Sequence, residues 1–140
     1  MKHAKYFLAA TAILLFGALS ARAADVKVIA NPSVSVSSVS AGDVQAVFLL
    51  DADSLGGSHV VPVLEKDGPT HEAFLKAFLG RNDAALQAFY RSLVFTGKAS
   101  MPKSLASDSE VVAYVAKTKG AIGYVSSGAS TEGVKTLTVK

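Results

Sequence analysis

Apolar residues recur along this chain with two different spacings, which separate candidate strands from candidate helices. The β-branched run at residues 26–30 (VKVIA) predicts a first strand, and residues 60–64 predict a second, placed at a sheet edge or frayed because it contains Pro62. Residues 121–125 are so small and apolar that they predict a central strand. Residues 134–139 alternate (VKTLTV) and predict a half-exposed final strand.

Four stretches carry the helical repeat together with start or stop signals. Residues 41–49 follow Ser40, with Asp43 completing a capping box. A second helix has Pro69 in its first turn and ends at Gly80. A third helix follows the cap at Asn82 and Asp83. The fourth begins after Ser107, with Glu110 predicted to bond back to the Ser107 amide, and ends at Gly120 in the C′ position.

The remaining segments complete the order of elements. Residues 33–40 (SVSVSSVS) fit either a strand or an extended loop, residues 51–58 and 96–103 read as loops, and residues 104–107 as a short strand. The order is therefore β-α-β-α-α-β-α-β-β. This alternation predicts an α/β fold: a single mostly parallel (mixed) sheet with helices on both faces, forming one domain over residues 24–140.

Residues 1–23 have the pattern of a signal peptide. A basic start containing Lys2 and Lys5 precedes an apolar run, and Ala21-Arg22-Ala23 fits the cleavage site. An uncleaved membrane anchor is the alternative, which the short apolar run disfavours. We therefore expect export to a bacterial periplasm, with no stable membrane insertion once the signal is removed.

Charge and composition exclude two further classes of function, nucleic-acid binding and cysteine chemistry. Loss of Lys2, Lys5 and Arg22 would reduce the 14 basic residues to 11, against 11 acidic residues. A nucleic-acid partner is excluded because the processed chain has no net positive charge and no Lys/Arg cluster. The chain contains no Cys, so disulfides, thiolate metal sites and thiol catalysis are excluded as well.

The sequence offers no arrangement for catalysis and needs no cofactor. It has no G-x-S-x-G elbow and no Ser/His/Asp order typical of a hydrolase, so we expect a protein that is not an enzyme. The two histidines beyond the signal, His59 and His71, do not match a known metal-ligand spacing. Asp51-x-Asp53 lacks the remaining ligands of a calcium loop and reads as a surface turn.

An ordered set of motifs resembles the substrate-binding proteins of phosphate ABC transporters. The set extends over nearly the whole processed chain and ends in its most specific part, residues 120–125 (GAIGYV). It comprises Asn31-Pro32 to Val39 with the following run to Leu49, Val61-Pro62-Val63, Gly68-Pro69-Thr70-His71-Glu72-Ala73-Phe74, and Ser107-Asp108 through to Val125.

The resemblance implies one lobe of the type-II periplasmic-binding-protein-like fold. Full-length members have two lobes that close over phosphate, and this chain has length for one. In the family, backbone amides at a helix N-terminus, hydroxyl groups and an Arg hold the anion. The resemblance therefore makes Gly68, Thr70 and His71 the candidate oxyanion ligands. Glu65 stands where the Arg is expected, and Pro69 has no amide to donate.

Two functions remain open at this point. The first is an exported phosphate-transporter-type substrate-binding-like protein that binds phosphate or another small oxyanion weakly, with an ABC permease or another periplasmic protein as its partner. The alternative is a ligand-less periplasmic interaction module that keeps the fold. Thr70 also fits an ordinary polar residue in a first helical turn, and Ser107-Asp108 fits either a second anion-attracting helix end or a structural cap.

Overall fold

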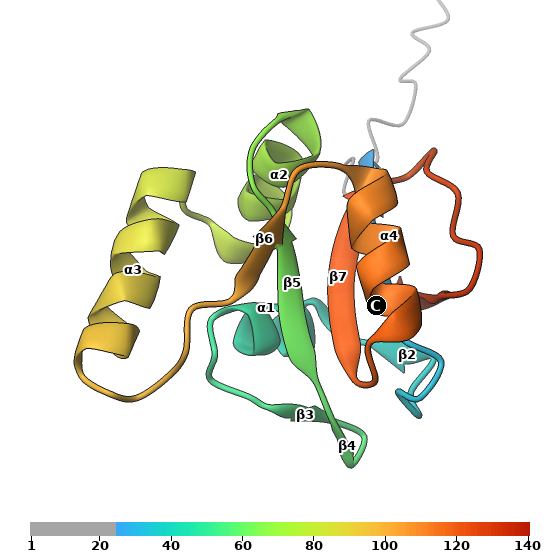
Figure 1. Cartoon of the computed structure of the whole chain (residues 1–140), viewed down its shortest axis with the longest axis horizontal. Coiled ribbons are helices and arrows are strands. Elements are labelled where there is room, and N and C mark those ends of the chain that lie inside the picture. The colour runs from blue at the N-terminus through green and yellow to red at the C-terminus, as the bar shows by residue number, and fades with distance from the viewer. Residues whose placement is uncertain (1–24) are drawn as a thin grey trace, which may run out of the picture.

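The computed structural model describes residues 25–140, and the predicted signal peptide lies outside them, as does Ala24. A six-stranded mixed sheet forms the centre of the molecule (Figure 1). Its strands lie in the order β2 (Ser38–Val39), β8 (Lys135–Val139), β1 (Val26–Ala30), β7 (Ala121–Ser126), β5 (Val61–Glu65) and β6 (Lys103–Leu105).

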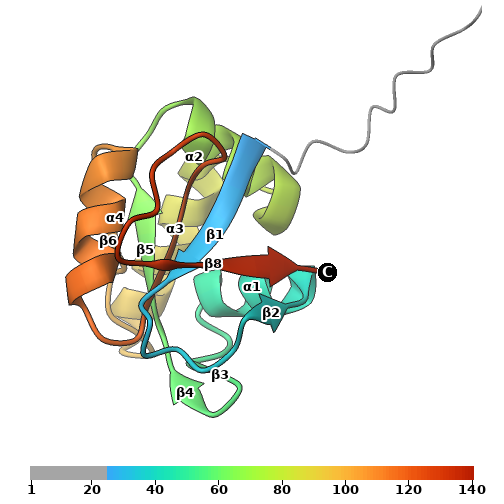
Figure 2. The ribbon, with the colours of Figure 1, turned by 90° about the vertical axis from the view of Figure 1, so that its right-hand side faces the viewer.

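The sheet contains both parallel and antiparallel strand pairs. The pairs β7–β5, β5–β6 and β2–β8 are parallel, whereas β1 runs antiparallel to both of its neighbours, β7 and β8. Figure 2 looks toward the side of the molecule that carries β1, β8 and β2. The predicted α/β fold with a mixed sheet is confirmed, and β7 is a central strand, as its apolar sequence predicted.

Helices pack on both faces of the sheet. The helix α4 (Asp108–Lys117) covers one face, where Val111 and Val115 pack with Ile29 and Val63. The other face carries α1 (Ala41–Phe48), α2 (Pro69–Phe74), the π-helical turn η2 (Leu75–Leu79) and α3 (Asp83–Phe95). Successive residues of a strand point to opposite faces, and β7 accordingly sends Tyr124 to the second face and Val125 to the first.

The local helix signals are largely confirmed. Ser40 Oγ accepts from the Asp43 amide and Asp43 accepts from the Ser40 amide, both at 3.0 Å. Gly80 ends η2 in the left-handed conformation, with φ of 63°. Ser107 caps α4, but Glu110 reaches the amide of Ala106 at 2.8 Å rather than that of Ser107.

Gly120 does not occupy the C′ position as predicted, because α4 ends at Lys117 and Thr118 is its C-cap. Gly120 occupies the turn into β7 with φ of 78°, and a Cβ there would lie 2.6 Å from the backbone oxygen of His59. The Gly120 carbonyl accepts from the Val61 amide at 2.9 Å, which starts the β5–β7 pairing. Glycine is required there both by its positive φ and by this close approach.

Three strand predictions need correction or refinement. The segment predicted as a loop at 51–58 contains a small hairpin, β3 (Ser54–Leu55) with β4 (Ser58–His59). Only Ser38–Val39 of the alternating Ser/Val run forms a strand. The edge position predicted for Pro62 is wrong, because β5 lies between β7 and β6, although pairing with β6 begins only at Val63.

Candidate functional site

An open cleft of about 960 Å³ lies at the carboxyl ends of β5 and β7. Three segments bound it: the start of α2, the start of α4 and the loop that leaves β7. Both helices begin at the same end of the sheet (Figure 1), because each follows a strand that ends there. In α/β folds this end of a parallel sheet is where ligands bind.

The lining of the cleft combines hydroxyl groups with carboxylates. No Lys, Arg or His is among the described residues that line it. Its side chains therefore offer hydrogen bonds but no positive charge. An anion in the cleft would be attracted only by the partial positive charge at the N-termini of α2 and α4. The hydroxyl and carboxyl groups belong to Glu65, Asp67, Thr70, Ser107, Asp108, Ser109, Ser126, Ser130 and Glu132.

Glu65 is the buried carboxyl group of the cleft. It is the last residue of β5, lies on the same face of the sheet as Val63 and is only 5 % exposed. Its Oε2 atom is buried and has no hydrogen-bond partner among the described residues. Burial, a hydrogen bond to Asp108 and the charge of Asp108 together raise the pKa of Glu65 to about 8. At neutral pH Glu65 is therefore a neutral carboxylic acid.

Asp108 is the ionised neighbour of Glu65 at the first turn of α4. Partial burial acts to raise its pKa, but hydrogen bonds from Ser126 and Glu65 outweigh burial and hold the pKa of Asp108 below its ordinary value. The Ser126 hydroxyl donates to Asp108 Oδ2 at 2.5 Å and the Ser126 amide donates to Oδ1 at 3.2 Å. Asp108 therefore links the start of α4 to the end of β7, and its charge favours the protonated form of Glu65 at the end of β5.

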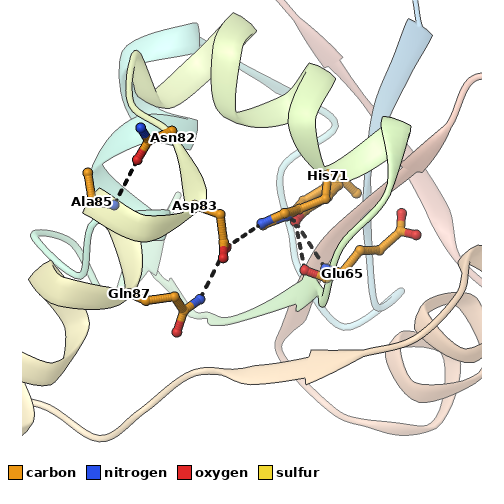
Figure 3. A network of polar contacts seen from close by, with 7 residues as sticks. Glu65, His71, Asn82, Asp83, Ala85 and Gln87 are labelled. Atoms are coloured by element: carbon orange, nitrogen blue, oxygen red, sulfur yellow. Dashed lines mark hydrogen bonds and ion pairs between the residues drawn. The ribbon is translucent and has the colours of Figure 1, made fainter.

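His71 belongs to a polar network beside the cleft that extends from the core to the partly exposed Asp83 (Figure 3). The side chain of His71 is 2 % exposed. Its Nδ1 lies 2.5 Å from the Tyr124 hydroxyl and its Nε2 lies 2.8 Å from Asp83 Oδ1. Tyr124 also accepts from the Glu65 amide at 3.0 Å. Burial raises the pKa of the Tyr124 phenol, which therefore stays protonated.

The structure separates the three oxyanion candidates. Gly68 and Thr70 line the cleft, whereas the His71 side chain does not and has both ring nitrogens engaged in the core. In Figure 3 the Glu65 side chain extends away from His71. The backbone amides of Thr70 and His71 precede the first α2 hydrogen bond, from Glu72 to Gly68, so they are among the free donors of the helix start.

Sequence reasoning missed the burial of Glu65 and its pairing with Asp108. The available signal was the period of two along β5, which places Glu65 on the same face as buried Val63. Among residues 25–140, no group of three or more His, Asp or Glu side chains could hold a metal ion. No helix in that range has the length and apolar character needed to cross a bilayer.

Comparison with known proteins finds similarity in structure alone. No family model and no curated protein matches the sequence. A solved phosphate ABC transporter substrate-binding protein from Clostridium perfringens, described with bound phosphate, has a TM-score of 0.61 and 19% identity over 82% of this chain. PstS from Borrelia burgdorferi has a TM-score of 0.65 and 13% identity over 83%. An ABC-type phosphate transport receptor from Vibrio cholerae has a TM-score of 0.55 and 13% identity over 82%.

These similarities show the fold. It is that of a periplasmic-binding-protein-like lobe. The chain spans less than half of each solved protein, namely 44%, 47% and 46% of the Clostridium, Borrelia and Vibrio chains. In this lobe the cleft end of the sheet carries the acidic residues Glu65 and Asp108, and the sequence resemblance led us to expect an Arg in place of Glu65.

Proposed function

We propose that this chain is an exported, phosphate-transporter-type substrate-binding-like protein that binds a small protonated oxyanion weakly in the cleft. The observation that carries the proposal is the position of the cleft. It lies where α2 and α4 begin, at the carboxyl ends of β5 and β7, in a lobe whose fold is shared with phosphate-transporter binding proteins. We propose no catalytic residue.

The ligand contacts that we propose come from Gly68, Thr70 and His71. All three would donate backbone amides, and Thr70 would add its hydroxyl. The carboxylates of Asp67, Asp108 and Glu132 can accept only from an oxyanion that still carries a proton, so the cleft favours hydrogen phosphate over sulfate. The missing positive side chain and the single lobe keep the affinity low.

Calorimetry with phosphate and sulfate tests the proposal. We expect a millimolar dissociation constant for phosphate near neutral pH, weaker binding of sulfate, and weaker binding of both above about pH 8, where Glu65 ionises. Thr70→Val should weaken phosphate binding about tenfold, the value of one hydrogen bond to a charged group. Thr138→Val, the same change at an exposed position of β8, is the control and should not change binding.

Absence of both heat and thermal stabilisation at millimolar phosphate would refute the oxyanion site. The acidic lining of the cleft favours the second candidate in that case, a ligand-less interaction module. Its partner would be an ABC permease or another periplasmic protein. That candidate requires a partner in a crosslinking pull-down from periplasm, and a chain recovered alone and monomeric would argue against it.

Export rests on the sequence of residues 1–23, which lie outside the described residues. We expect the protein recovered from a periplasmic extract to begin at Ala24, since the small-x-small pattern ends at Ala23. Intact-mass measurement of the extracted protein checks this. A mass that includes residues 1–23 would contradict the signal peptide and would support the membrane anchor.

A further inference from the structure

Three of the four large hydrophobic side chains that are exposed among residues 25–140 occur within eight residues of one another. They are Val94 and Phe95 at the end of α3 and Met101 in the loop that follows, here called the apolar tip. Phe95 is 93 % exposed. Only Leu86 and Tyr90 of α3 are fully buried, and both lie in the first eight residues of the helix.

The charged residues of the segment that carries the apolar tip are all basic. Residues 84–107 contain Arg91, Lys98 and Lys103 and no Asp or Glu, although residues 24–140 have equal numbers of basic and acidic residues. Arg91 is four residues before Phe95 and therefore lies on the same side of the helix. All three basic residues are exposed, and Lys103 also lies 5.3 Å from the centre of the Tyr114 ring.

The position of the apolar tip separates it from the cleft. In Figure 1 the loop after α3 lies at the end of the molecule opposite to the starts of α2 and α4. None of the residues from 91 to 103 lines the cleft. Whatever the tip contacts can therefore be bound while the cleft stays open.

We propose that the apolar tip and its basic neighbours bind the surface of an anionic phospholipid bilayer. Phe95 and Met101 enter the boundary between headgroups and acyl chains, while Arg91, Lys98 and Lys103 lie among the phosphate groups. Proteins that bind reversibly to anionic bilayer surfaces commonly do so through apolar side chains flanked by basic residues. The contact holds the lobe at the membrane surface with its cleft facing away.

A bilayer suits this surface better than a protein partner. A stable protein interface buries about 800 Å² on each side around an apolar centre, and the three side chains of the apolar tip are too few to supply that centre. A fluid bilayer needs no complementary shape, because lipids rearrange around an inserted ring. The absence of acidic residues across residues 84–107 matches the negative lipid phosphates.

Vesicle flotation of the processed chain tests the proposal. We expect binding to vesicles of phosphatidylglycerol and phosphatidylcholine at low salt, loss of binding at high salt, and no binding to phosphatidylcholine alone. Phe95→Ser should weaken binding about tenfold, from the lost burial of the ring. Lys98→Glu should weaken it about thirtyfold, from the reversal of one charge near the surface.

Lys66→Glu provides the matched control, because it makes the same charge change at an exposed lysine at the cleft end of the sheet. It should bind vesicles as the wild type does. The proposal is overturned if neither vesicle binds, if both bind equally, or if Phe95→Ser and Lys98→Glu bind like the wild type. Self-association that depends on Phe95, without vesicle binding, would instead identify a protein interface.

Discussion

Replacing Glu65 by glutamine is expected to remove a decline in stability that the wild type shows between about pH 4.5 and about pH 8. The pKa of Glu65 is about 8 in the folded chain, against an ordinary value of 4.5. The folded state therefore holds this proton more tightly than the unfolded state. Stability is full below pH 4.5, falls as the pH rises through the window, and stays at its lower value above about pH 8.

The size of this loss of stability is limited by how steeply the free energy of unfolding can change with pH. One group can contribute at most about 1.4 kcal/mol per pH unit, and water in the open cleft reduces the figure by screening the charge. The glutamine side chain keeps the shape of the neutral acid and can donate to Asp108. The Glu65→Gln variant should therefore match the wild type at acid pH and exceed its stability at alkaline pH. Urea unfolding at several pH values measures both.

Glu72→Gln is the matched control, since it makes the same change at an exposed glutamate of α2. It should keep the pH dependence of the wild type. Asp108 does not interfere within the window: because its pKa is lowered on folding, its contribution is lost only as the pH falls below the acid end. A Glu65→Gln slope equal to that of the wild type would show that Glu65 is not protonated in the fold.

The sequence predicted those features of the fold that depend on neighbouring residues. The capping box of Ser40 and Asp43 is closed by atoms three residues apart, and Gly80 ends its helix through its own backbone conformation. The same holds for the small apolar residues of β7, which indicated a central strand. Periodicity and caps carry such information because the interactions are local.

Features that depend on distant residues could not be predicted in this way. The antiparallel placement of β1 depends on its pairing with β7 and β8, which lie near the other end of the chain. His71 looked like a candidate at the start of a helix, but Tyr124 and Asp83 hold its ring inside the core. For Glu65 the strand period indicated the buried face, whereas its neighbour Asp108 is known only from the fold.

The largest loss of stability is expected from Phe74→Ala. Phe74 is 0 % exposed and stacks on Tyr124, with ring centres 3.8 Å apart, and it meets Phe48 edge to face at 4.8 Å. Its removal leaves a cavity between α1, α2 and the sheet. Such truncations cost about 3–5 kcal/mol, a large share of the roughly 5–15 kcal/mol that holds a domain folded. Urea unfolding should show the transition moved to much lower denaturant.

Phe95→Ala makes the same chemical change at a ring that is 93 % exposed. Its stability should lie within about 0.5 kcal/mol of the wild type, because the ring buries little on folding. Equal losses for Phe74→Ala and Phe95→Ala would mean that Phe95 packs against the protein in solution, which would also remove the basis for membrane binding by the apolar tip. A Phe95→Ala protein that keeps its stability but no longer floats with anionic vesicles would show that the Phe95 ring contributes to membrane binding and not to folding.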